Sequence, residues 1–215
     1  MKHVTKGPSP KVFEAWKNQA SDEWQPSYKQ LANPEKLDVH SSLLAEQGWV
    51  CCYCGRAIDV QDSHIEHFRP QSVYAALELN FDNMHVSCLR QRDRRAPLHC
   101  GHAKGDGLDE ARLIDPQDPS CEARFIYTAL GQIVPTDSSD DRAKYMAGLL
   151  KLDSPVLNAM RADVINASLG PEVLETLSDV ELMTFRDACR ARDAQGKLSP
   201  LGHVLARYAD QYLRA

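Results

Sequence analysis

The sequence predicts an α+β fold in which a cysteine-rich centre with short strands is flanked by two helical segments. Apolar residues recur with helical spacing before residue 48 and after residue 137, and clustered cysteines, histidines and short strand-like runs lie between them. We therefore expect an N-terminal helical segment over residues 1–48, a central core over 49–136 and a C-terminal helical region over 137–215.

The N-terminal helical prediction covers residues 9–47. Pro10 precedes an amphipathic stretch, and Asn33-Pro34 is typical of an N-cap followed by proline in the first helical turn. Gly48 stands where a glycine commonly follows the last turn of a helix, so we expect the helical segment to end there.

Two hairpins are expected in the central core. The run WVCCYCGRAIDV, from Trp49, favours a short hairpin with a tight cysteine turn at its tip, and RFIYTALGQIVP favours a second hairpin around Gly131. Residues 64–106 hold polar and metal-binding side chains in a pattern too irregular to assign to helices or strands.

Helix start signals mark the C-terminal region. Ser154-Pro155 and Ser199-Pro200 each favour an N-cap followed by proline, and Ser178 with Glu181 favours a capping box. The last helix carries an apolar stripe that is typical of a core face or of a partner-docking face. Its members are Leu201, Val204, Leu205, Tyr208 and Tyr212.

The composition is that of an ordinary folded protein. Hydrophobic residues make up 43% of the chain and charged residues 26%, and no apolar run approaches the roughly 20 residues that span a bilayer, so we expect no membrane partner. The start, MKHVTKGPSP, lacks the apolar centre of a signal peptide, which predicts a cytoplasmic protein. In that reducing compartment, seven cysteines are expected to be thiols or metal ligands.

The charge is unevenly distributed. A net charge of −5 argues against a general nucleic-acid-binding protein, but the stretch from Val86 to Lys104 is basic. A local basic patch on an acidic chain favours a phosphate-binding site over a long electrostatic track, with a solvated charged loop as the alternative. The basic residues of this stretch, opposed by Asp93 alone, are Arg90, Arg92, Arg94, Arg95 and Lys104.

Four cysteines predict a zinc site. Cys51-x-x-Cys54 has the spacing that lets two thiolates bind one tetrahedral ion from a single turn. Cys88 and Cys100 offer a second pair, and a loop can carry the eleven residues between them at modest entropic cost. Cys52 can replace Cys51, although C-x-C is the less usual spacing, and the thiols can also be buried without a ligand. We predict a closed structural Zn²⁺ site formed by Cys51, Cys54, Cys88 and Cys100.

Glu66 and His67 place a carboxylate beside an imidazole. Hydrolysis of a phosphodiester needs a general base for water and a hard cation for the charge on the phosphoryl oxygens. Histidine is a base near neutral pH, and carboxylate or amide oxygens hold Mg²⁺ or Mn²⁺. The alternative for His67 is an ordinary core histidine.

Taken together, Cys51-x-x-Cys54, Glu66-His67, Asn83 and the run CGHAKG from Cys100 resemble the HNH nuclease family, the ββα-metal fold, in this order. The resemblance is closer to one branch, the PtuB nuclease subunits of Septu and some retron anti-phage systems. It extends over most of the chain through GPSP, LLAEQGWVCCYCG, IEHFRPQ and LKLDSPVLNAMR.

The resemblance implies an endonuclease that acts on DNA or tRNA. In it His67 activates water, Glu66 binds the catalytic Mg²⁺ or Mn²⁺, and Asn83 orients His67 or the metal loop. The resemblance also implies control by a PtuA-type ATPase, joined in retron systems by a reverse transcriptase and its RNA–DNA hybrid. The C-terminal helices from Asp140 onward are expected to be the docking surface.

One position departs from the family pattern. The residue after the last cysteine is normally Asn or His in the family, and here it is Gly101. His102 is the nearest replacement as a catalytic residue and metal ligand, with His64 and His99 in reserve.

Arg69 and Lys104 are the phosphate contacts that the motif suggests, although Lys104 can instead cap a helix or pair with Asp106. Two other classes of function compete with the nuclease. One is a zinc-stapled module that binds nucleic acid without cutting it, and the other is an interaction adaptor with a vestigial site.

Overall fold

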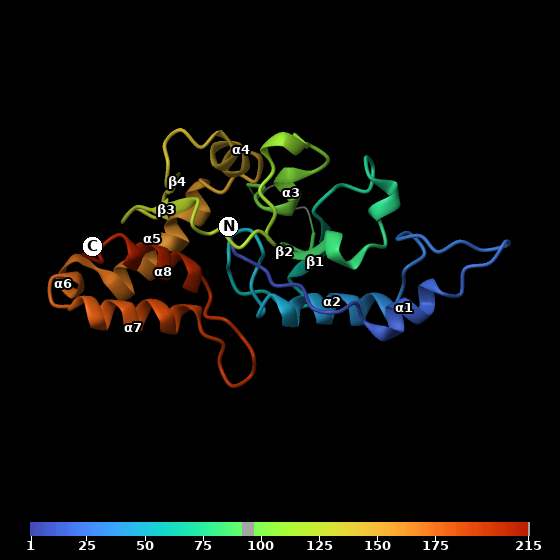
Figure 1. Cartoon of the computed structure of the whole chain (residues 1–215), viewed down its shortest axis with the longest axis horizontal. Helices are drawn as coiled ribbons and strands as arrows, with labels where there is room; N and C mark the ends of the chain where they lie inside the picture. The colour runs from blue at the N-terminus through green and yellow to red at the C-terminus, as the bar shows by residue number, and fades with distance from the viewer. Residues whose placement is uncertain (92–96, 215) are drawn as a thin grey trace.

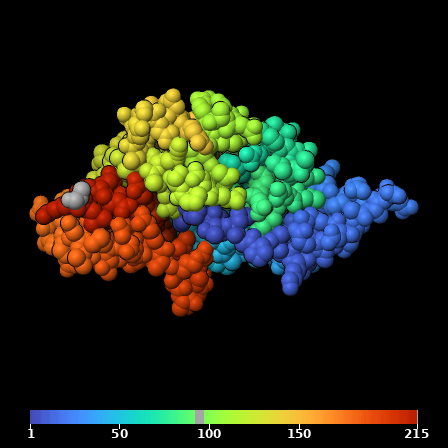
Figure 2. Space-filling model, in the orientation of Figure 1, coloured from blue at the N-terminus to red at the C-terminus, as the bar shows by residue number. Residues whose placement is uncertain are grey.

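The computed structural model describes residues 1–91 and 97–214. The fold is mixed α+β, with short antiparallel strands and several helices, as the sequence predicts. Figure 1 shows the N-terminal helices at one end, the C-terminal helices at the other, and the first residues of the chain in the centre. The space-filling view shows the middle of the chain lying between these two ends (Figure 2).

The N-terminal segment contains two helices, α1 over Lys11–Lys17 and α2 over Glu35–Glu46. The prediction of helix throughout 9–47 is therefore too broad. Helix α2 begins one residue later than expected, with Pro34 at the N-cap after a cis Asn33-Pro34 bond, so Asn33 is not the cap. Gly48, with φ of +67°, follows the C-cap and ends the helix as predicted.

The central core is built on the antiparallel pair of β1 (Ser63–His67) and β2 (Met84–Cys88). Their register aligns Ser63 with Cys88 and His67 with Met84. Short 3₁₀ turns, η1 (Ala75–Leu77) and η2 (Phe81–Asn83), fill the connection between the strands, and the short helix α3 (Gly101–Lys104) follows β2. Helix α2 packs against β2 (Figure 1).

The predicted cysteine turn is present as a bridge between Val50 and Ala57. The buried side chain of Gln47 holds this turn to the sheet, because its amide nitrogen donates to the carbonyls of Val50 and Val86, each at 2.9 Å. Its amide oxygen accepts from the Val86 N–H at 2.6 Å. One glutamine thus satisfies backbone groups of both elements that carry cysteines.

The hairpin predicted around Gly131 is confirmed as β3 (Phe125–Tyr127) paired with β4 (Ile133–Pro135). Gly131 has a φ of +74°, and a Cβ there would lie 1.9 Å from the carbonyl oxygen of Asn158. The hairpin packs against the C-terminal helices α4 (Asp141–Leu149) and α8 (Gly202–Asp210), across the segment boundary expected at residue 136.

The C-terminal region contains five helices among the described residues, preceded by the 3₁₀ turn η3 (Glu110–Arg112). The capping box of Ser178 and Glu181 and the Ser154 N-cap position are confirmed. The prediction from Ser199-Pro200 is wrong, because Leu201 adopts a left-handed conformation and the last helix begins after it. The helices are α4 (Asp141–Leu149), α5 (Pro155–Leu169), α6 (Pro171–Leu174), α7 (Asp179–Arg190) and α8 (Gly202–Asp210).

One buried apolar core runs through all three expected segments, with Phe13 of α1, Val86 of β2 and Leu205 of α8 among its members. Each such side chain contributes about 1.5–3 kcal/mol when it leaves water. The stripe on α8 is largely part of this core, although Tyr212, beyond the end of the helix, is 46% exposed. Within residues 1–91 and 97–214, no helix combines the length and the apolar character needed to cross a membrane.

Candidate functional site

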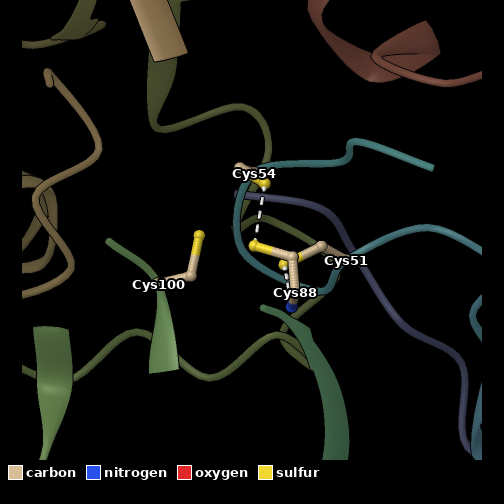
Figure 3. A group of neighbouring side chains, drawn as sticks. All are labelled: Cys51, Cys54, Cys88 and Cys100. Atoms are coloured by element: carbon tan, nitrogen blue, oxygen red, sulfur yellow. Dashed lines mark hydrogen bonds between the residues drawn. The ribbon is translucent and has the colours of Figure 1, made fainter. Parts of the chain in front are cut away.

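Four buried cysteine sulfurs converge between the cysteine turn and the end of β2 (Figure 3). All four sulfur atoms lie within 4.8 Å of one another, and those of Cys54 and Cys88 are 3.8 Å apart. Zn–S bonds of about 2.3 Å place the corners of a tetrahedron about 3.8 Å apart. The cluster can therefore hold a metal ion such as zinc, and its members are the four predicted ones, Cys51, Cys54, Cys88 and Cys100.

Backbone geometry brings these sulfurs together. The N–H of Gly55 donates to the Cys51 carbonyl at 2.9 Å, which closes the turn, and Gly55 has a φ of +75°. Cys88 is the last residue of β2, while Cys100, with a φ of +57°, precedes α3 and donates its N–H to the Leu150 carbonyl. The two halves of the cluster thus come from elements that are far apart in the sequence.

Neighbouring groups stabilise the sulfurs. The backbone N–H of Cys88 donates to the Cys51 sulfur at 3.4 Å, and the Ser87 hydroxyl lies 3.9 Å from the same sulfur. Nδ1 of His99 lies 3.2 Å from the Cys100 sulfur and 3.6 Å from that of Cys88. The sequence did not indicate Ser87 in this role.

The electrostatics of the cluster favour a cation. Burial alone would raise the pKa of Cys51, but hydrogen bonds from neighbouring thiols bring that pKa well below its ordinary value. Burial, with the thiolate of Cys51 nearby, raises the pKa of Cys100 well above its ordinary value. A dication that binds all four sulfurs replaces the protons that the metal-free cluster keeps. Cys52 is buried but lies outside the cluster, so the choice of Cys51 is supported.

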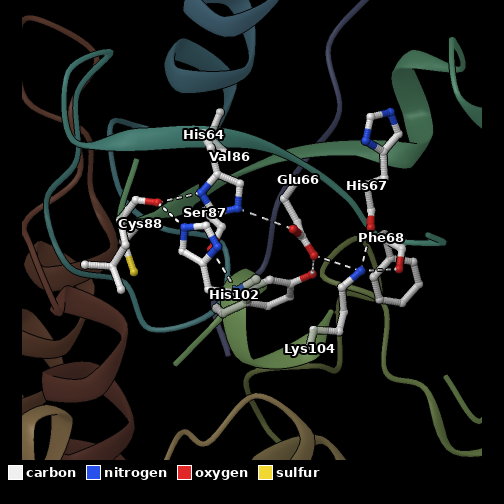
Figure 4. Close-up of polar contacts among 12 residues, drawn as sticks. His64, Glu66, His67, Phe68, Val86, Ser87, Cys88, His102 and Lys104 are labelled. Carbon is white, nitrogen blue, oxygen red and sulfur yellow. Dashed lines mark hydrogen bonds and ion pairs between the residues drawn. The ribbon is translucent and has the colours of Figure 1, made fainter. Parts of the chain in front are cut away.

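Glu66 lies buried on β1, on the face that meets α3 (Figure 4). Its Oε1 is 2.7 Å from the Lys104 ammonium and accepts from the Tyr53 hydroxyl at 3.2 Å, while its Oε2 is 3.4 Å from Nε2 of His64. Burial raises the pKa of Glu66, but the contacts with His64 and Lys104 outweigh it, so the net pKa is lowered. The side chain is an anchored carboxylate at neutral pH.

His67 follows Glu66 on the strand, so its side chain points to the opposite side (Figure 4). Nε2 donates to the Glu78 carbonyl at 2.9 Å, and Nδ1 accepts from the Gln71 amide at 3.0 Å. The ring meets Tyr28 edge to face. Burial lowers the pKa of His67, and the ring is therefore neutral near pH 7, with a lone pair on Nδ1. Glu66 and His67, which the sequence places side by side, thus point to opposite sides of β1.

Asn83 holds the backbone that follows His67. Its Oδ1 accepts from the Arg69 N–H at 2.8 Å, and its Nδ2 donates to the carbonyls of Arg69 at 3.0 Å and Leu77 at 3.3 Å. This side chain positions the loop beyond β1 through backbone contacts, and it makes no hydrogen bond to the His67 ring among the described residues.

His64 and His102 stack with ring centroids 4.4 Å apart (Figure 4). Nδ1 of His64 and Nε2 of His102 lie 2.8 Å and 2.7 Å from the same carbonyl oxygen, that of Leu89. The residue that the structure places against Glu66 is therefore His64, which shares a strand face with it, and His102 lies behind His64. The sequence favours His102 for this position, with His64 in reserve.

A pocket of about 410 Å³ joins these groups. Its lining includes His64, Glu66, His67, Gln71 and His102. A carboxylate and a neutral imidazole therefore border one solvent-accessible space, although they belong to opposite sides of a strand.

The predicted phosphate contacts have other partners. Lys104 is 3% exposed, and its ammonium contacts Glu66 and donates to the carbonyls of His67 and Phe68, so its donors are directed into the protein. Arg69 pairs with Glu110 at 3.2 Å on the surface. Arg90 is exposed and donates to the Val60 carbonyl at 2.8 Å. Three further predicted contacts lie outside the described residues, namely Arg92, Arg94 and Arg95.

The fold and the site define a mixed α+β protein with a buried four-cysteine cluster suited to zinc. No protein-family model matches the sequence, and no curated protein is significantly similar to it.

Proposed function

We propose that this protein is a metal-dependent HNH-type endonuclease that hydrolyses phosphodiester bonds of DNA or tRNA. The observation that carries the proposal is the 410 Å³ pocket, which both His67 and Glu66 line. Its supporting frame is a strand pair followed by a short helix, β1, β2 and α3, with the cysteine cluster at its base.

In this proposal, Nδ1 of His67 accepts a proton from the attacking water. The Glu78 carbonyl fixes the ring proton on Nε2, and the lowered pKa keeps Nδ1 unprotonated near pH 7. Gln71, which donates to Nδ1, occupies the place that the water would take and has to turn aside. Its side chain lines the same pocket.

Glu66 would bind Mg²⁺ or Mn²⁺, and the cation would neutralise charge on the phosphoryl and leaving oxygens. Lys104 and Tyr53 contact Oε1 of Glu66, which leaves Oε2 facing His64 at the pocket. The four cysteines would hold a structural Zn²⁺, because four sulfur ligands leave no open position for water. The two metals thus have separate tasks.

Control by a partner is part of the proposal, since an unrestrained nuclease would damage its host. The resemblance points to a PtuA-type ATPase in an anti-phage complex, with a retron reverse transcriptase as a further partner. The helices from Asp140 onward would form the surface that binds the ATPase. Exposed apolar side chains on α7, Val180 at 67% and Met183 at 39% exposure, are suited to such a contact.

The proposal is tested by incubating the zinc-loaded protein, with and without its ATPase, with DNA and tRNA in Mg²⁺ or Mn²⁺. We expect cleavage by the wild type and a loss of about 10²–10⁴-fold in His67→Ala, the range for a lost general base. His3→Ala is the matched control, because His3 borders a different pocket. Equal cleavage by wild type and His67→Ala would refute the assignment of the base.

A second candidate function is a zinc-stapled module that binds nucleic acid without cutting it. The ion pair of Glu66 and Lys104, both buried, favours this candidate, because such a pair can be purely structural. Salt-sensitive binding to nucleic acid, without any metal-dependent product, would support it over the nuclease.

A further inference from the structure

The Leu89 carbonyl fixes the proton position on two imidazoles. A carbonyl oxygen can accept two hydrogen bonds but cannot donate, so Nδ1 of His64 and Nε2 of His102 must be the donors. Nε2 of His64 pairs with Oε2 of Glu66 when the ring is charged, and it carries the lone pair when the ring is neutral, because Nδ1 keeps the other proton. Metal-binding histidines are oriented in this way, with the second ring nitrogen donating to a carbonyl or a carboxylate.

The spacing of the two facing atoms fits a shared cation. Nε2 of His64 and Oε2 of Glu66 are 3.4 Å apart. Bonds of about 2.1 Å at angles of 90–109° separate two ligands of one ion by about 3.0–3.4 Å. His64 and Glu66 are two residues apart on β1, so their side chains share one face of the strand. Both line the 410 Å³ pocket, which gives water and phosphate oxygens access to the remaining coordination positions of such an ion.

Gly101 provides the space that His64 occupies. A Cβ at position 101 would lie 2.5 Å from Oε2 of Glu66 and 2.9 Å from Nε2 of His64. A larger side chain at position 101 would therefore point at the same place as the imidazole. The absence of a side chain at Gly101 and the presence of the His64 imidazole in that space are two parts of one arrangement.

We propose that His64 and Glu66 together bind the catalytic divalent cation, with the imidazole of His64 taking the place of a side chain at position 101. This inference rests on the proposed nuclease function. His102 is a positioning residue, because it stacks on His64 and shares the Leu89 carbonyl with it. An imidazole donor favours Mn²⁺ and later transition ions over Mg²⁺, so the site should discriminate against Mg²⁺.

The test is titration of Mn²⁺ and Mg²⁺ into the full-length, zinc-loaded protein, followed by calorimetry and by the electron paramagnetic resonance signal of free Mn²⁺. We expect one Mn²⁺ per chain in addition to zinc, bound more tightly than Mg²⁺. His64→Ala should weaken Mn²⁺ binding at least tenfold and reduce the preference over Mg²⁺. His40→Ala is the matched control, since His40 hydrogen-bonds Ser63 at 3.0 Å and does not line the pocket.

Moving the proposed ligand from position 64 to position 101 distinguishes the loss of a metal ligand from a loss of folding. In the His64→Ala background, the space left by the imidazole lets the Glu66 carboxylate move away from a Cβ at position 101. Gly101→Asn can then place an amide near the former position of the imidazole, and it should restore at least part of the Mn²⁺ affinity. The same Gly101→Asn change in the wild type should collide with His64 and Glu66 and weaken binding. Circular dichroism and zinc content establish that each variant is folded.

The outcomes distinguish this inference from the proposed function. Equal Mn²⁺ affinity in His64→Ala and wild type, with nucleic-acid cleavage intact, would overturn the role of His64 and leave the nuclease standing. Mn²⁺ binding that depends on His64, without cleavage of DNA or tRNA under any partner condition, would retain the site and overturn the nuclease. A wild type that binds zinc alone would overturn the inference.

Discussion

The Lys104 ammonium lies 2.7 Å from Oε1 of Glu66, and both side chains are more than 90% buried. The same ammonium donates to the carbonyl of His67, the next residue of the strand. Lys104 therefore fixes the β1 backbone and the carboxylate at once, although the motif alone suggested a phosphate contact. Its position in α3 joins that helix to the strand that carries the proposed base.

We predict that Lys104→Met destabilises the protein by about 3–5 kcal/mol, because it leaves the Glu66 carboxylate buried without its cation. Urea unfolding of the zinc-loaded protein measures this change. Lys144→Met is the control, since Lys144 is exposed and its pair with Asp141 should contribute less than about 1 kcal/mol.

A double variant checks the cause. Adding Glu66→Gln to Lys104→Met removes the uncompensated charge, so the double variant should be more stable than Lys104→Met alone. If the double variant were less stable than the single one, charge burial would not explain the effect.

The sequence was most informative where ligands are set by local spacing. Cys51 and Cys54 lie in one turn, so their pairing is a local signal, whereas Cys88 and Cys100 come from a distant part of the chain and were predicted from residue type. The hairpin at Gly131 and the capping box at Ser178 are likewise signals contained in a few neighbouring residues. Such features depend little on how distant elements pack.

Features that depend on long-range pairing were not predicted. The β1–β2 register, which aligns Glu66 with His85 and His67 with Met84, is set by residues about 20 positions further along the chain. The start of α8 is set by a hydrogen bond from the Leu201 N–H to the Gly55 carbonyl at 2.7 Å. That contact overrides the local preference of Ser199-Pro200.

We predict one equivalent of zinc per chain and cooperative unfolding when a chelator removes it. Structural zinc contributes about 10–16 kcal/mol in small zinc domains, comparable with the 5–15 kcal/mol of net stability of a typical protein. Cys54→Ala should lose both zinc and the folded core, as measured by elemental analysis and circular dichroism. Cys121→Ala should keep its zinc, because Cys121 is buried outside the cluster. Full zinc content in Cys54→Ala would contradict the assigned ligands.

Gly101→Ala is predicted to destabilise the protein by about 1–3 kcal/mol, the range for overpacking. The added methyl group would lie within 3 Å of Glu66 and His64, and Glu66 is held by its ion pair with Lys104. Gly148→Ala is the control, since a Cβ there has nothing within 4 Å and α4 should gain about 0.5–1 kcal/mol. Thermal unfolding compares the two variants, and similar melting temperatures would indicate that the space at Gly101 is not restricted.

His85 should make the protein sensitive to mild acid. The ring is fully buried, and neither ring nitrogen has a hydrogen-bond partner within the described part of the chain. Burial, with the positive charge of Lys6 as a smaller cause, lowers the pKa of His85 to about 3. The unfolded chain takes up this proton near pH 6.5 and the folded protein does not, so stability is lost as the pH falls below 6.5.

Lowering the pH from 7.5 to 5.5 should reduce the free energy of unfolding by about 1.4 kcal/mol through His85 alone, which is the value of one pKa unit. We predict that His85→Leu loses less stability than the wild type over that interval, by about this amount, in urea unfolding of the zinc-loaded proteins. The other histidines are present in both proteins, so their contributions cancel in the comparison. Identical losses in the two proteins would mean that His85 takes up its proton without unfolding, and that the interior around it admits water.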